Sequence, residues 1–127
     1  EYGFEVPVTL GITVRTSMSQ AALADTGVTR PMAEQVNVLA EQAKRAGISG
    51  VVASPQEASM LRDVLGPEGY IVTPGVRPAG AALGDQSRVA TPAQAFANGA
   101  SHIVIGRPIT QAADPAAAFD AIVAELD

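Results

Sequence analysis

The sequence contains no cysteine. This absence excludes disulfide bonds, catalysis by a thiol and zinc–thiolate sites, and it fits a reducing compartment such as the cytoplasm. No run of about 18 apolar residues occurs, so we expect no membrane span and no membrane partner. Lys and Arg number 8 against 13 acidic residues, the net charge is −5, and the basic residues do not cluster. Nucleic acid is therefore not an expected partner.

What the chain does have is the composition of a folded domain. It has 127 residues, of which 47% are hydrophobic and 17% charged, which is enough for one core and too apolar for a disordered chain. We expect residues 1–127 to form a single domain. The start, EYGFEVPV, lacks an initiator methionine and the features of a secretory signal. We therefore expect a processed chain or a piece of a longer one, located in the cytoplasm.

Segments typical of strands and of helices alternate along the chain. The strand segments are short and rich in β-branched residues, and the helical segments carry apolar residues on one face. Several helices begin with a capping residue followed by proline: SPQE predicts a capping box between Ser54 and Glu57, TPAQ repeats the pattern from Thr91, and Asp114 caps the last helix. The predicted strands are 7–14, 48–54, 70–74 and 101–106, and the predicted helices are 31–47, 54–66, 91–99 and 114–127.

This alternation predicts an α/β fold of four βα units with a parallel sheet. The strands are apolar on both faces, as strands buried on both sides are. Two architectures remain open: a doubly wound sheet, or one half of a (β/α)₈ TIM barrel, which needs roughly 250 residues. A four-stranded arc cannot close, so its outer strands would expose unpaired backbone groups. We therefore expect a dimer or higher oligomer, unless the N-terminal residues fold back over an edge strand.

Polar residues and glycines gather after the strands, at the edge of a parallel sheet where ligands bind. Thr16 and Ser19 follow the first strand, the long loop 75–90 follows the third, and Gly106 and Arg107 follow the fourth. Glycine lets backbone N–H groups approach a phosphate, and arginine offers a planar, bidentate cation. The pattern is compatible with a phosphate site and equally with loops that bind nothing.

Several longer motifs carry a family resemblance. VRTSMSQ, GVVASPQE, IVTPGVRPAGAALGDQSRVATPAQA and IVIGRPITQAADPAAAFDAI resemble the C-terminal half of bacterial orotidine 5'-phosphate decarboxylases, from about Ile12 to the end of the chain. The combination of TPGVRP, GDQ, TP and GRPIT is specific, whereas GRP alone would be weak. The resemblance implies a (β/α)₈ barrel, usually a homodimer, that converts orotidine monophosphate to UMP and CO₂ in pyrimidine biosynthesis. It implies no metal or organic cofactor.

The same resemblance assigns roles to individual residues. Arg77, Gln86 and Arg107 would hold the substrate phosphate beside the backbone of Gly106. Thr16 would line the nucleotide site, and Ser19 would contact the pyrimidine ring. The loop 75–90 would close over the ligand as a lid.

One departure from the family pattern concerns the catalytic motif. The family carries D-x-K-x-x-D on an earlier strand, and its lysine protonates the carbon that loses CO₂. That motif is absent here, and the only lysine, Lys44, lies in a helical segment where a solvated surface charge is expected. The first six residues do not match the family either. The sequence therefore predicts no catalytic residue of its own.

Three functions remain open. The chain is a decarboxylase segment that needs a complementing N-terminal half, or an inactive half barrel that self-associates and at most binds phosphate, or a different phosphate-binding barrel lyase or isomerase. The motif GDQ, TP and GRPIT argues against the third.

Other polar residues have simple structural explanations. The single histidine, His102, begins the fourth strand, away from the functional end, and no catalytic role is expected for it. Asp85 is either a hinge contact or a turn residue. Arg88 is expected to be a solvated loop charge rather than a phosphate ligand, and Arg15 is as compatible with a salt bridge as with a ligand contact.

Overall fold

The protein forms a four-stranded parallel sheet whose spatial order, β1-β2-β3-β4, follows the order of the sequence. The computed structural model describes residues 3–81, 84 and 88–126. The strands are β1 (Leu10–Ile12), β2 (Gly50–Val52), β3 (Tyr70–Pro74) and β4 (His102–Val104). All four predicted strands are present, but the first, second and fourth are shorter than expected, because only their central residues pair with a neighbour.

The predicted helices are also present, and two short helices join them. The helices are α1 (Gln20–Asp25), α2 (Met32–Arg45), α3 (Ala58–Leu65), α4 (Pro92–Ala97), α5 (Arg107–Thr110) and α6 (Pro115–Ala124). Helix α1 lies between the first predicted strand and the first predicted helix, and α5 lies in the GRPIT segment. Ser19 caps α1 by accepting a hydrogen bond from the backbone N–H of Ala22 at 3.2 Å. The carbonyl of Gly106 accepts from Thr110 at 3.0 Å and closes the one turn of α5.

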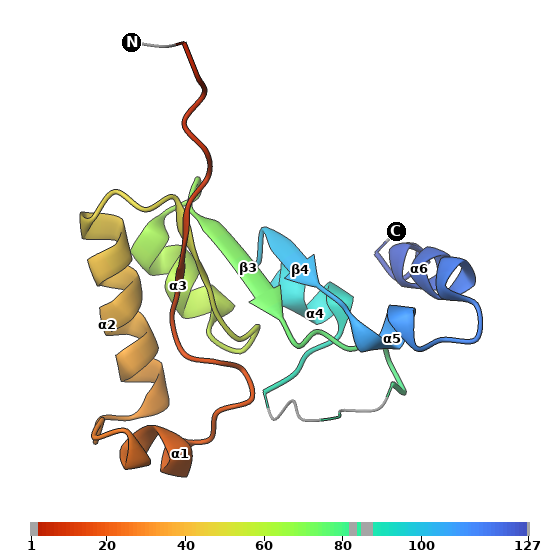
Figure 1. Ribbon diagram of the computed structural model, residues 1–127, viewed down its shortest axis with the longest axis horizontal. Coiled ribbons are helices and arrows are strands. Elements are labelled where there is room, and N and C mark those ends of the chain that lie inside the picture. The colour runs from red at the N-terminus through yellow and green to blue at the C-terminus, as the bar shows by residue number, and fades with distance from the viewer. Residues whose placement is uncertain (1–2, 82–83, 85–87, 127) are drawn as a thin grey trace.

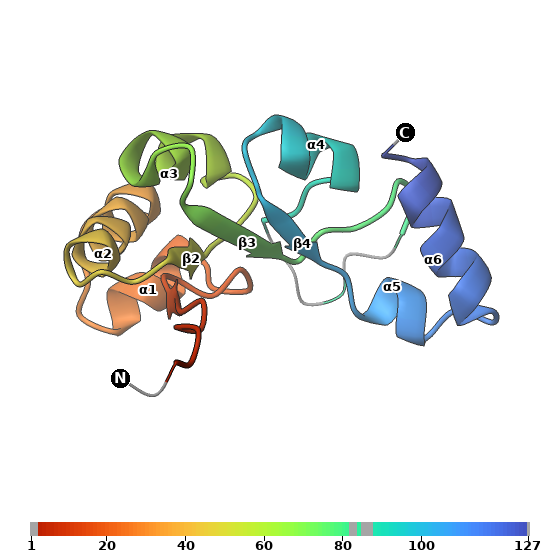
Figure 2. The ribbon, with the colours of Figure 1, turned by 90° about the horizontal axis from the view of Figure 1, so that it is seen from above.

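The strand order decides between the two architectures left open. A doubly wound sheet reverses its strand order at a switch point and carries helices on both faces. Here every strand pairs in parallel with the next strand of the sequence, and α2, α3 and α4 lie on the same side of the sheet (Figure 2). This is the arrangement of consecutive units in a (β/α)₈ barrel, so the described chain is an open arc of such a barrel.

The main core lies between that side of the sheet and helices α2 and α3. Ile71 in β3 and Val51 in β2 are fully buried, as are Val36 of α2 and Leu61 of α3. Along the strands, Ile71 and Val51 alternate with side chains on the opposite face. One face of the sheet is therefore packed, as in a barrel wall covered by its outer helices.

The opposite face of the sheet is not covered, which corrects the expectation of strands buried on both sides. Ile12 of β1 is 66% exposed and Val104 of β4 is 49% exposed. The strand register places Ile12 in one row with Val52, Val72 and His102. We call this surface the open face; its apolar members are Leu10, Ile12, Val52, Tyr70, Val72, Pro74 and Val104. In a closed barrel the same positions point into the interior.

The two ends of the chain also leave apolar surface exposed. Helix α6 packs chiefly against α5, and only Ile122 of its apolar face is buried, while Phe119 is 54% exposed. Residues 3–9 run away from the body of the fold (Figure 1), and Phe4 is 86% exposed. Residues 3–9 therefore do not fold back over an edge strand. No described helix is both long and apolar enough to cross a membrane.

Candidate functional site

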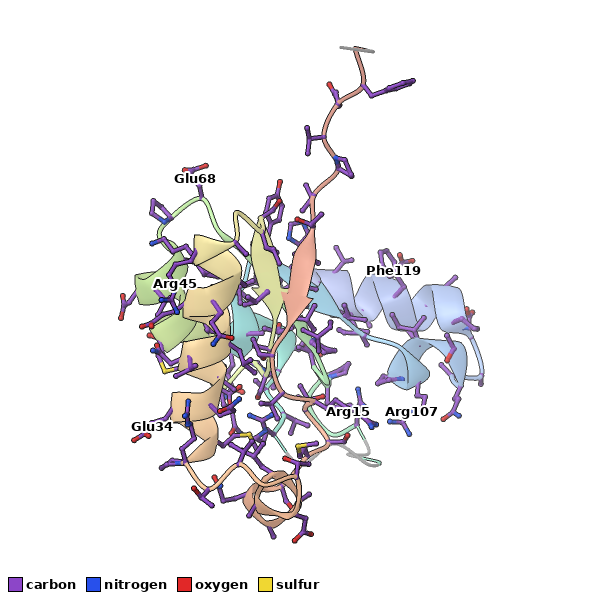
Figure 3. The ribbon with its side chains drawn as sticks, turned by 60° about the vertical axis from the view of Figure 1, so that its left-hand side comes forward. Arg15, Glu34, Arg45, Glu68, Arg107 and Phe119 are labelled. Atoms are coloured by element: carbon purple, nitrogen blue, oxygen red, sulfur yellow. The ribbon has the colours of Figure 1, made fainter. Side chains whose placement is uncertain are left out.

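The site lies at the edge of the sheet where the parallel strands end. Arg107 begins α5 directly after β4, and Arg15 follows β1. Figure 3 shows both arginines on the side toward which the strands point, with Glu68 at the opposite end. The loops that the sequence singles out therefore emerge from a single edge of the sheet.

One cleft at this edge brings together two of the predicted residues. Arg77 and Arg107 both line a cleft of about 230 Å³, and Gly84, Pro108 and Gln111 complete most of its wall. Had the two arginines lain on opposite rims, they could not have reached a common ligand. We call this feature the Arg77–Arg107 cleft.

Arg77 lies where the two legs of the loop 75–90 meet. Its backbone N–H donates to the carbonyl of Ala90 at 3.0 Å. This hydrogen bond joins the first residues of the loop (the outgoing leg) to its last residues (the returning leg). The residue is only 7% exposed, and its Nη1 donates to the carbonyl of Val76 at 3.1 Å. The position of the guanidinium group therefore depends on the geometry of this loop stem.

Arg107 is placed by the short helix α5 and approached by a glycine of the loop. A Cβ atom added to Gly84 would lie 3.2 Å from Nη1 of Arg107, and the backbone of Gly84 has a φ of +61°. A side chain at this position would be strained and would crowd the guanidinium group. Glycine is thus the residue that allows the loop backbone to pass close to Arg107.

The other predicted site residues are distributed differently. Thr16 is 7% exposed and lines a second cleft of about 190 Å³ together with Arg15, Ser17 and the ends of β1, β2 and β3. Ser19 is exposed and caps α1, and Gly106 lies beside Arg107 at the start of α5. Gln86 lies outside the described residues, as does Asp85. Of the described site residues, Arg77 and Arg107 thus line one cleft and Thr16 lines the other, whereas Ser19 and Gly106 line neither.

Two functional candidates were misjudged from the sequence. Arg88, expected as a solvated loop charge, forms an ion pair with Glu57, and their side chains are only 13% and 8% exposed. Arg88 Nη2 also donates to the carbonyl of Arg15 at 3.0 Å. The predicted capping box does not open α3, because the helix begins only at Ala58; the carboxylate of Glu57 lies against Arg88 as well as Ser54. Ser54 instead accepts from the N–H of Gln56 at 3.2 Å.

The environment of Glu57 changes its acidity. Burial raises the pKa of its carboxyl group above the usual 4.5, while the charge of Arg88 opposes this effect. No local pattern in the sequence identifies this pair, because its partners are 31 positions apart.

The charged side chains that line these clefts are arginines. Among the described residues that line them, none is an aspartate, glutamate, histidine or lysine. Two arginines that line one cleft suit an anion with several oxygens, such as a phosphate. His102 stacks on Tyr70 with ring centroids 5.6 Å apart and begins β4, so it lies away from both clefts, as expected.

Comparisons with known proteins agree on one family. The family model described as "Orotidine 5'-phosphate decarboxylase / HUMPS family" matches residues 5–122. Orotidine 5'-phosphate decarboxylase of Moorella thermoacetica is 54% identical over 122 residues, which cover 95% of this chain and 48% of that protein. The decarboxylase of Rhodopseudomonas palustris strain BisB5 is 52% identical over 117 residues, or 92% of this chain and 50% of that protein. The chain spans about half the length of these curated relatives.

Solved structures give the same result. The crystal structure of orotidine 5'-phosphate decarboxylase from Lactobacillus acidophilus matches with a TM-score of 0.80 and 42% identity, covering all of this chain and 52% of the other. The enzyme from Pyrococcus horikoshii OT3 matches with a TM-score of 0.60 and 27% identity, covering 79% and 45%. The match to the family model begins at residue 5, earlier than the expected start near Ile12, so it includes the last two of the six residues expected to lie outside the family.

Proposed function

This chain belongs to the orotidine 5'-phosphate decarboxylase / HUMPS family, and on that premise we propose that it is the C-terminal, phosphate-binding half of an orotidine 5'-phosphate decarboxylase. The complete enzyme would convert orotidine monophosphate to UMP and CO₂. The observation that carries the proposal is the Arg77–Arg107 cleft, in which two cations from consecutive strand ends line one small cavity.

The size and charge of the cleft suit one part of the substrate. At about 230 Å³ it is smaller than the roughly 300–1,000 Å³ of pockets that bury a whole small molecule. In this proposal it holds the phosphate, with Arg77 and Arg107 as charged ligands and with Gln86 and the backbone of Gly106 beside them. Thr16, in the second cleft, lines the nucleotide, and Ser19 contacts the pyrimidine ring.

This half contributes binding energy, and another polypeptide segment contributes the proton. Contacts to a phosphate remote from the reacting carbon accelerate a reaction when they help to align the substrate in the transition state. The only lysine, Lys44, is exposed on α2 and donates to the carbonyl of Val64 at 2.7 Å. It therefore ties two helices together, and a D-x-K-x-x-D segment from an N-terminal half must supply the catalytic acid.

The proposal is tested by mixing two polypeptides. This chain and a separate N-terminal half of a relative, carrying D-x-K-x-x-D, should together release CO₂ from orotidine monophosphate. Arg107→Ala should weaken UMP binding by about 10- to 100-fold, because a charged hydrogen bond contributes roughly 1.5–3 kcal/mol. It should lower the activity of the mixture accordingly.

Arg45→Ala is the matched control. Arg45 is exposed and lies on α2, far from Arg107 (Figure 3), so its loss should leave both UMP affinity and turnover unchanged. Equal UMP affinity of the wild-type chain and Arg107→Ala would reject the site.

A second function is favoured by the open face of the sheet. The chain could be an inactive half barrel that pairs with a second copy and binds phosphate only weakly. Under this alternative, UMP binding would still require Arg107, but no N-terminal half would restore CO₂ release.

A further inference from the structure

We propose that Arg88 and Glu57 form a positioning pair for the phosphate site, holding the stem of the loop 75–90 so that Arg77 lines the same cleft as Arg107. The inference rests on the proposed function, because it assigns these residues a role in the binding of phosphate by the Arg77–Arg107 cleft. Neither residue lines that cleft, so their action on a ligand must pass through Arg77.

The first step of the argument is that Arg88 connects three loops. It belongs to the loop after β3, it pairs through Nη1 with Glu57 in the turn after β2, and its Nη2 donates to the carbonyl of Arg15 after β1 at 3.0 Å. The hydroxyl of Ser54 donates to the carbonyl of Arg88 at 3.2 Å. Side chain and backbone of Arg88 are thus both fixed to neighbouring strand ends.

The second step links this anchor to Arg77. Ala90, two residues after Arg88, accepts the hydrogen bond from the backbone N–H of Arg77. If Arg88 is released, the returning leg of the loop loses its attachment to the loops after β1 and β2. The carbonyl that fixes the backbone of Arg77 then moves with this leg, and Arg77 loses its place in the cleft that it shares with Arg107.

The third step concerns the chemistry of the pair. An arginine can donate in two directions at once because its guanidinium group is a planar fork, whereas a lysine offers a single point charge. Here Nη1 of Arg88 pairs with the carboxylate of Glu57, and Nη2 donates to the carbonyl of Arg15. Both side chains are largely buried, so removal of one partner leaves an unpaired buried charge and can unfold the chain.

The test must therefore separate positioning from stability. Replacing a buried ion pair by apolar residues of similar size is often neutral for stability, so the key variant is the double substitution Glu57→Leu/Arg88→Met. Arg88→Lys is the conservative single variant. Each is compared with the wild-type chain in thermal unfolding and in calorimetric titration with UMP, with inorganic phosphate and with uridine, which has no phosphate.

We expect the double variant to remain folded and to bind UMP and inorganic phosphate about tenfold more weakly, with unchanged affinity for uridine. Arg88→Lys should recover part of the loss. In an Arg77→Ala background the double substitution should cost no further affinity, because its effect passes through Arg77. A merely structural role would lower the unfolding temperature and leave the affinity of the folded chain for phosphate unchanged.

The outcomes also separate this inference from the proposed function. If Arg107→Ala loses UMP binding but Glu57→Leu/Arg88→Met binds UMP like the wild type, the positioning role is wrong and the phosphate site stands. If the losses of Arg77→Ala and of the double substitution are additive, the pair does not act through Arg77. If Arg107→Ala binds UMP like the wild type, the site and the positioning role are both overturned.

Discussion

At the scale of single residues, Glu57 shows how a local pattern can miss a distant partner. It stands three positions after Ser54, the spacing of a capping box, yet its carboxylate pairs with Arg88 in a different loop. Ser54, Pro55 and Glu57 form a turn ahead of α3 rather than its first turn. A sequence pattern reports neighbours along the chain, and this interaction depends on the fold bringing two strand ends together.

The acidity of Glu57 predicts a pH dependence of stability. Burial raises its pKa in the folded chain above the unfolded value of 4.5. Protonated Glu57 therefore favours folding fully below that unfolded value, and this contribution is lost as the pH rises through the raised pKa. We expect the free energy of unfolding of the wild type to fall relative to that of Glu57→Gln as the pH rises from 4.5, measured by urea denaturation.

Glu68→Gln provides the control for this measurement. Glu68 is exposed at the opposite end of the sheet (Figure 3), so its profile should follow that of the wild type. Parallel pH profiles for the wild type and Glu57→Gln would show that burial of this carboxylate has no energetic effect.

At the scale of elements, the sequence predicts well where the signal is periodic or local. The strands and the longer helices are recovered, and the caps at Thr91 and Asp114 form as expected. Helices α1 and α5 have only 6 and 4 residues, too few to show a periodicity of 3.6. They were missed because they also lack the Thr-Pro start that revealed α4, which has 6 residues too. For the site, the sequence predicted that Arg77 and Arg107 come together, but it could not predict the contacts of Arg88.

The capping box of α4 gives a prediction at this scale. The hydroxyl of Thr91 accepts from the N–H of Gln94 at 3.3 Å, and the side chain of Gln94 accepts from the N–H of Thr91 at 3.1 Å. Thr91→Ala should lower the free energy of unfolding by about 1 kcal/mol. Thr91→Ser should retain most of this contribution, because serine can also cap the helix. Urea denaturation measures both.

Thr29→Ala is a matched substitution at an exposed loop position and should change stability little. A Thr91→Ala variant as stable as Thr29→Ala would mean that the box contributes nothing to the fold.

At the scale of the whole molecule, the open face is the feature that the sequence misrepresented. Its strands are apolar on both sides, which is typical of complete burial, but Ile12 and Val104 are exposed. Composition reflects the environment for which a strand is suited, and it cannot tell whether the covering partner belongs to the same chain. Exposed apolar surface of this kind favours association with another polypeptide.

We therefore expect the isolated chain to self-associate, with sedimentation coefficients that rise with concentration. Ile12→Asp and Val104→Asp should each weaken association by about tenfold or more, because a carboxylate would be buried at the contact. They should leave helical circular dichroism unchanged, because both positions are exposed in the single chain.

Gln42→Asp, on the exposed surface of α2, should associate like the wild type. A wild-type chain that sediments as a compact monomer at every concentration would contradict the role given to the open face.

The course of residues 3–9 has a practical consequence. This segment enters β1 from the amino-terminal end of the sheet (Figure 1), whereas Arg77 and Arg107 follow the carboxyl ends of β3 and β4. A dye, an affinity handle or a tether to a sensor chip attached ahead of Gly3 would sit across the full depth of the sheet from the entrance to the cleft. The chain can thus be immobilised in one orientation with the Arg77–Arg107 cleft facing the buffer.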